Sequence, residues 1–111
     1  MTKLLNFLNE KPTKENDVYQ IKDNNYLPLL TVSHTSLFPT KSTNGHSHQD
    51  KDEVYFFESG NGKLIINHNQ EYFVKGGDIY LISAGDHHRV ENLSSFHSLE
   101  FTCVFNGERN H

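Results

Sequence analysis

Two histidines one residue apart, followed by a glutamate, stand out in the stretch NGHSHQDKDEVYFFESGNGK, residues 44–63. Side chains of an extended chain alternate between its faces, so His46 and His48 should project to the same side, about 7 Å apart. Two imidazoles at that spacing can bind one metal ion. Glu53 would join them if residues 49–52 make a turn, because a buried carboxylate needs a compensating charge, which a metal provides.

A further ligand could come from the histidine pair that follows the turn SAGD. His87 and His88 are adjacent and should point to opposite faces of a strand, so only one of them can serve. The residues by themselves leave both open, and histidines in polar loops are often only solvated.

The elements that would position these residues are short strands. From Leu29 onward, segments rich in Val, Ile, Phe, Tyr and Thr alternate with turns rich in Gly, Asn, Ser and Pro, which predicts a β-sandwich or barrel. The segment HSLEFTCVF, residues 97–105, alternates a hydrophobic face with a polar one. Residues 62–67 and 71–75 flank the polar connector 67–70 and predict a hairpin.

The N-terminal part of the chain is less patterned. Residues 2–9 show weak helical periodicity, and we expect a short N-terminal helix or arm there. Residues 10–26 are polar and rich in Asn and Lys, typical of a loosely held lead-in strand or a linker. We therefore divide the 111 residues into an arm and lead-in segment, 1–26, and a single β-barrel domain, 27–111.

Spacing around the histidines resembles the two motifs of the cupin superfamily. Residues 46–60 read H-x-H-x4-E-x6-G, and residues 77–92 read G-x5-S-x-G-x2-H-x3-N. The resemblance covers about Leu29 to Phe105 and selects His88 over His87.

Two turn positions depart from the cupin pattern. Thr40 stands where the first motif usually opens with glycine, so we expect the backbone there not to be left-handed. Ser83 replaces the usual proline of the second motif, which removes a preset φ angle. The four ligand positions are intact.

The resemblance implies an all-β fold, a small antiparallel β-barrel of jelly-roll type, with a metal inside. The implied ligands are His46, His48, Glu53 and His88. Mixed nitrogen and oxygen ligation suits one divalent transition metal, Fe, Mn, Ni, Co, Cu or Zn, without choosing among them. Such domains often pair, and we expect a homodimer, because exposed edge strands favour being covered.

Three residues are candidates for proton transfer near the metal. His34 could face the interior of the barrel, although such a residue is more often a satisfied or surface histidine. Tyr55 shares the strand face of Glu53 and would offer a hydroxyl group. His97 shares the face of Leu99 and could line the mouth of the cavity, or could be solvated after the turn NLSS.

The fold hosts many activities, so the site must indicate the function. The leading hypothesis is an isomerase or epimerase of a sugar or sugar-acid derivative, in which the metal acidifies a C–H bond beside a carbonyl and a nearby base moves the proton. The runner-up is an Fe(II)-dependent dioxygenase. A third reading is a non-catalytic module that binds a small ligand.

Composition excludes several other classes. Ten Lys and Arg residues against 14 Asp and Glu give a net charge of −4, which argues against nucleic acid as a partner. No apolar run approaches the roughly 18 residues of a membrane helix, and the N-terminal cluster is too short and polar for a signal peptide. Cys103 is the only cysteine, which excludes an internal disulfide. We expect a cytoplasmic protein.

Overall fold

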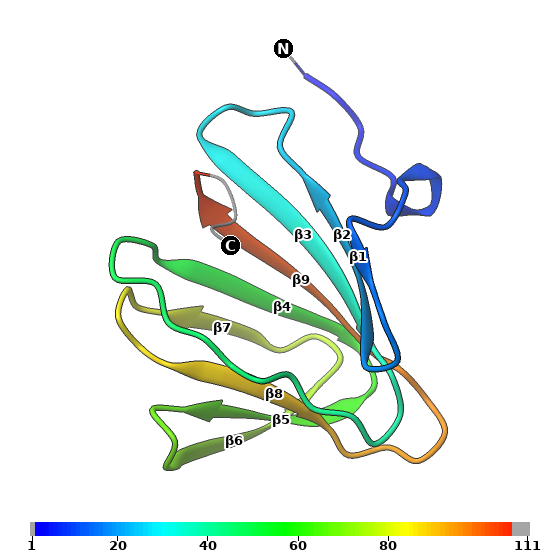
Figure 1. Ribbon diagram of the computed structural model, residues 1–111, viewed down its shortest axis with the longest axis vertical. Coiled ribbons are helices and arrows are strands. Elements are labelled where there is room, and N and C mark those ends of the chain that lie inside the picture. The colour runs from blue at the N-terminus through cyan, green and yellow to red at the C-terminus, as the bar shows by residue number, and fades with distance from the viewer. Residues whose placement is uncertain (1, 108–111) are drawn as a thin grey trace.

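Two antiparallel sheets make up the computed structural model, which describes residues 2–107 (Figure 1). One sheet has six strands in the order β1-β2-β3-β9-β4-β7, and the other has three in the order β6-β5-β8. The strands are β1 Lys14–Glu15, β2 Tyr19–Asn24, β3 Leu30–Leu37, β4 Glu53–Ser59, β5 Asn61–Ile66, β6 Gln70–Lys75, β7 Ile79–Ile82, β8 His88–Asn92 and β9 Leu99–Asn106.

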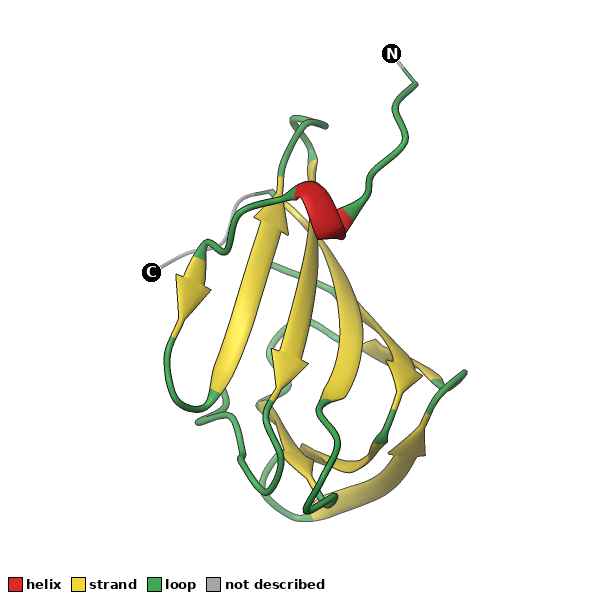
Figure 2. Cartoon of the chain, turned by 90° about the vertical axis from the view of Figure 1, so that its right-hand side faces the viewer, coloured by secondary structure: helices red, strands yellow, loops and turns green. Residues whose placement is uncertain are grey.

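The expected all-β, jelly-roll architecture is confirmed. The two sheets are inclined to each other, and the core lies between them (Figures 1 and 2). Its fully buried members come from both sheets, and the largest are Phe57, Leu37, Leu64, Leu99 and Val90. Burying such side chains contributes about 1.5–3 kcal/mol each, which favours this closed arrangement.

Strand β9 occupies the middle of the large sheet, between β3 and β4. Its alternation is as predicted: Leu99, Phe101 and Cys103 are buried, whereas Glu100 and Thr102 are half-buried on the other face. The strand begins at Leu99, so the residues before it belong to a loop.

In strand β3, most of the buried side chains are polar and hydrophobic side chains lie on the outer face. The small polar residues Thr31, Ser33 and Thr35 are buried, while Leu30 is 39% exposed on the outer face. The inner surface of the large sheet is therefore partly polar at this strand.

The predicted hairpin is confirmed as β5 and β6. Their register runs from Asn61 opposite Lys75 to Ile66 opposite Gln70. Asn67 and His68 both have positive φ, 52° and 68°, in the turn. Asparagine tolerates this left-handed conformation better than most residues.

The expectation for Thr40 is wrong. Its φ is 66°, in the left-handed region, although the residue is not glycine. Residues 38–41 form a turn in which the Lys41 amide donates to the Phe38 carbonyl at 3.1 Å. With Pro39 second and Thr40 third, this arrangement is typical of a type II turn, which requires positive φ at the third position whatever residue occupies it.

The second motif forms a tight turn and a buried polar anchor. The Asp86 amide donates to the Ser83 carbonyl at 3.1 Å, and Gly85 has a φ of 89°, so the turn closes without proline. Asn92 is 3% exposed. Its amide nitrogen lies within hydrogen-bond distance of three carbonyls, those of Leu37 at the end of β3 and of the loop residues Phe38 and His97.

At the N-terminus, the expected helix is only a 3-10 turn, η1 Phe7–Asn9. The lead-in segment contributes β1 and β2, and β2 pairs with β3 along six residues. No helix within residues 2–107 has the length and apolar character needed to cross a membrane. Residues 108–111 of the expected 27–111 domain lie outside the described part.

Candidate metal centre

Backbone hydrogen bonds fix the two histidines of the first motif. His46 exchanges both backbone bonds with His88, at 3.1 and 2.9 Å, which holds the ligand loop against the start of β8. The His48 carbonyl accepts from the Gly85 amide at 2.6 Å. Glu53 begins β4 opposite Phe105 of β9. The loop and two strands are thus brought together by main-chain contacts.

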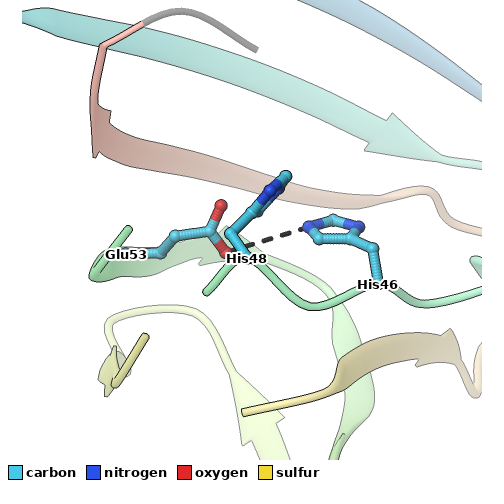
Figure 3. A group of neighbouring side chains, drawn as sticks. All are labelled: His46, His48 and Glu53. Carbon is cyan, nitrogen blue, oxygen red and sulfur yellow. Dashed lines mark ion pairs between the residues drawn. The ribbon is translucent and has the colours of Figure 1, made fainter. Parts of the chain in front are cut away.

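The side chains of His46, His48 and Glu53 point toward one another (Figure 3). One ligand atom from each lies within 4.8 Å of the others, and Nε2 of His46 is 3.9 Å from Oε2 of Glu53. Three donor atoms this close are suited to a common metal ion.

His88 adds a fourth donor to this group. Its Nε2 lies 2.5 Å from Oε2 of Glu53, and its ring is 4.4 Å from that of His46. Its Nδ1 lies 3.0 Å from the Asp86 carbonyl, which can only accept, so Nδ1 donates there. In the neutral tautomer with that hydrogen bond, the lone pair of Nε2 is directed at Glu53.

The contact between His88 and Glu53 tests whether a metal fits. Both atoms are buried, and neither has a hydrogen-bond partner in the described part of the chain. A carboxylate and a neutral imidazole in this arrangement each offer a lone pair to a divalent cation. The residues present therefore fit a divalent metal.

Charge in the site favours the ligand forms of these groups. Burial raises the pKa of the Glu53 carboxyl, but the imidazoles of His46 and His88 favour its ionised form and bring the pKa to about 2. Burial lowers the pKa of His48, and the neighbouring His46 lowers it further. An ionised carboxylate and a neutral imidazole are the forms that bind metals.

A cavity of about 520 Å³ adjoins these side chains. Tyr55, Phe101 and Cys103 contribute to its wall, together with Thr35 of β3. Sequence reasoning missed a second group of lining residues, which come from β1, β2 and the residue before them: Thr13, Lys14, Tyr19, Ile21 and Asp23. The alternation of Tyr19, Ile21 and Asp23 was the available signal, but the polar residues around it resembled a linker.

Of the three candidates for proton transfer, Tyr55 lines the cavity. It is 5% exposed, and its ring lies edge-on to that of His88, with centroids 5.4 Å apart. His97 is exposed, in the loop before β9, and is not among the lining residues. Phe57, two residues after Tyr55 along β4, is fully buried in the core.

His34 does not face the interior, so, of the two readings left open above, the structure agrees with a histidine satisfied outside the cavity. Thr35 and Ser33, its neighbours on β3, are the inward residues, and strand alternation therefore puts His34 on the outer face. There its Nε2 lies 3.1 Å from Glu100, and its Nδ1 lies 3.3 Å from Glu58. The ring of Phe7, from the N-terminal arm, lies 5.5 Å away.

Raising the pH should weaken the folded state through His34. Its hydrogen bond with Glu100 is the largest cause of its raised pKa, and the charge of Glu58 adds to this. Only the imidazolium has two N–H groups to satisfy both carboxylates. Because the folded pKa exceeds the unfolded value of about 6.5, this stabilisation is complete below that pH and disappears as pH rises through the raised pKa.

Urea unfolding between about pH 5.5 and 9 measures this effect. The free energy of unfolding should decrease with pH more steeply in the parent than in His34→Gln, whereas the exposed His97→Gln should follow the parent. Parallel curves for the parent and His34→Gln would contradict the assignment.

Comparisons with known proteins agree with this geometry. The family model for a cupin domain matches residues 34–105. The L-ectoine synthase of Rhodococcus erythropolis is 32% identical over 74 residues, 66% of this chain, and the chain spans only 54% of that protein's length.

Solved structures share the fold at lower identity. KdgF from Halomonas sp. superposes with a TM-score of 0.84 at 13% identity, covering 99% of this chain and 97% of its own. The polyketide cyclase RemF from Streptomyces resistomycificus has a TM-score of 0.82 at 17% identity, covering 100% of this chain and 83% of its own. These similarities establish the architecture, and the reactions named for the relatives differ.

Proposed function

Because the chain belongs to the cupin family, we propose that it is a metal-dependent enzyme acting on a small polar molecule. More specifically, we propose an isomerase or epimerase of a sugar or sugar-acid derivative. The observation that supports the metal part is the buried contact of 2.5 Å between Glu53 Oε2 and His88 Nε2, two atoms without a hydrogen-bond partner in the described part of the chain.

The proposed ligands are His46, His48, Glu53 and His88. A divalent ion held there would polarise a carbonyl group and acidify the neighbouring C–H bond. It would be one of Fe, Mn, Ni, Co, Cu or Zn, since the donor set accommodates all six.

The chain's other lining residues would orient the substrate and move the proton. We assign the proton transfer to Tyr55, because His34 and His97 lie outside the cavity. Hydroxyl and carboxylate groups of Thr35, Thr43 and Asp23 would hydrogen-bond to substrate hydroxyls, while Phe101 and Phe105 restrict the entry of water.

Deuterium exchange tests the isomerase proposal. Metal-loaded protein is incubated in D₂O with a panel of free and phosphorylated sugars and sugar acids, and mass spectrometry detects deuterium beside the carbonyl. Exchange above that of metal-free protein supports the proposal. Oxygen consumption by the iron-loaded protein would instead favour a dioxygenase, and binding without turnover a ligand-binding module.

We also propose a homodimer, formed through β7 in a reducing, cytoplasmic setting. Strand β7 is an edge of the large sheet, and identical edge strands related by a two-fold axis can pair antiparallel. Beside this edge, Leu81 and Ile79 are 80% and 60% exposed and pair across the sheet with Val54 and Phe56, which forms a contiguous apolar patch.

Light scattering should give twice the mass of the chain at a protein concentration of about 50 µM. That concentration exceeds a Kd in the micromolar range, so the dimer would be populated. Leu81→Asp should return it to the monomer by placing a charge in the apolar patch. Phe96→Asp is the matched control, because Phe96 is 86% exposed in a loop away from β7. A monomeric parent would refute the dimer.

A further inference from the structure

We propose that Lys51 and Asp52 are positioning residues for the metal centre. Together they clamp the connector formed by residues 49–52, which joins the ligands His48 and Glu53. This inference rests on the proposed metal site and adds to its four ligands.

Lys51 is the unusual member of the connector. The residue is only 7% exposed, and its Nζ donates to the Asn106 carbonyl at 2.9 Å. Within residues 2–107 it forms no ion pair with a carboxylate. Lysine is almost never buried unless it is paired, since removing an ammonium group from water is costly. A buried lysine bonded to a carbonyl in this way indicates a specific role.

The surroundings of the ammonium group are closely fitted. A Cβ atom at Gly107 would lie 2.9 Å from Nζ of Lys51, and Gly107 has a φ of 76°, which side chains rarely adopt. The glycine that follows β9 thus leaves room for the Lys51 ammonium group, and a side chain at position 107 would collide with it. Lys51 and Glu53 are both buried, with the exposed Asp52 between them, so the Lys51 side chain lies on the same side of the chain as the ligand two residues later.

Asp52 holds the other side of the connector. Its Oδ1 accepts from the Ala84 amide at 2.9 Å, and the next amide, that of Gly85, donates to the His48 carbonyl. The connector is therefore tied to the end of β9 by Lys51 and to the turn before β8 by Asp52. Groups that orient ligands typically change metal affinity by about 10–100-fold when removed.

A purely structural role would give a different result, and Thr31 provides the comparison. Its hydroxyl donates to the Gly107 carbonyl at 2.6 Å, so it holds the same end of β9 without touching the connector. Thr31→Val removes that bond and leaves the residues 49–52 intact. Any effect transmitted only by loosening the end of β9 should appear in this variant too.

The experiment titrates Co(II) into the full chain and records both the affinity and the visible absorption spectrum of the bound ion. Lys51→Met should weaken Co(II) binding about 10–100-fold and alter the spectrum. Asp52→Ala, at an exposed position, should fold normally and weaken binding in the same direction. Thr31→Val should bind Co(II) like the parent even where thermal unfolding in EDTA shows it to be destabilised.

The outcomes separate the two proposals. Co(II) binding and spectra in Lys51→Met and Asp52→Ala equal to those of the parent would overturn the clamp while leaving the metal site intact. Equal weakening in Thr31→Val would also overturn it. A parent that binds no Co(II) would refute the proposed function itself and the clamp with it. If Lys51→Met does not fold, Asp52→Ala decides the matter alone.

Discussion

Replacing His88 by alanine should leave the protein unable to retain its metal. We expect the parent to carry about one divalent metal ion per chain, and the variant to lose affinity by more than about 100-fold, the upper end of the effect of groups that only orient ligands. The physical reason is that the buried His88 Nε2 lies 2.5 Å from Oε2 of Glu53, whereas His46 Nε2 lies 3.9 Å from the same oxygen. Elemental analysis after gel filtration measures the stoichiometry.

His46→Ala and Glu53→Ala should lose metal in the same way, and His97→Ala, in an exposed loop, should retain it. Acid should release the metal as well. Because the pKa of Glu53 is about 2, the carboxylate stays ionised through most of an acid titration, so protonation of the imidazoles accounts for the release. Parent-like metal content in the His46 and Glu53 variants would show that the ion binds elsewhere.

The four proposed ligand residues could be selected because the motif spacing survives in the sequence, and the structure brings their side chains together. Strand alternation also identified the inward residues of β9, where one face is hydrophobic and the other polar. The same reasoning could not decide which face of β3 carries His34. In β3 the residues facing the interior are Thr31, Ser33, Thr35 and Leu37, of which Thr35 lines the cavity, whereas Leu30 and Val32 lie on the outer face with His34. Alternation gives the two faces of a strand, but hydrophobicity indicates the inner one only where the interior is apolar.

Other features depended on contacts that a single sequence does not reveal. The turn at residues 38–41 imposes a left-handed conformation on Thr40 through the hydrogen bond that closes it. Strands β1 and β2 are polar, and their place in the sheet follows from the pairing of β2 with β3 and of β1 with β2. This is why Lys14 and Asp23 were not recognised as cavity residues.

Tyr55→Phe should separate chemistry from metal binding. The variant keeps the ring that contacts His88 and loses only the hydroxyl group, so it should bind metal like the parent. If Tyr55 moves the proton, deuterium exchange into the sugar substrate should fall by about 10²- to 10⁴-fold, the usual contribution of general acid–base catalysis. His88→Ala should lose exchange and metal together. The comparison needs both measurements on the same preparations.

Two further variants complete the test. Tyr72→Phe, at a tyrosine 41% exposed outside the cavity, should exchange deuterium like the parent. Asp23→Asn removes the other carboxylate of the cavity wall that can accept a proton. If Tyr55→Phe exchanges deuterium at the rate of the parent and Asp23→Asn loses most of the exchange, proton transfer would be assigned to Asp23 of β2 instead of Tyr55. The isomerase would be refuted if the metal-loaded parent exchanges no deuterium across the panel yet consumes oxygen with an organic acid or thiol. That result would indicate a dioxygenase, which can use the same metal ligands and does not require deuterium exchange beside a carbonyl.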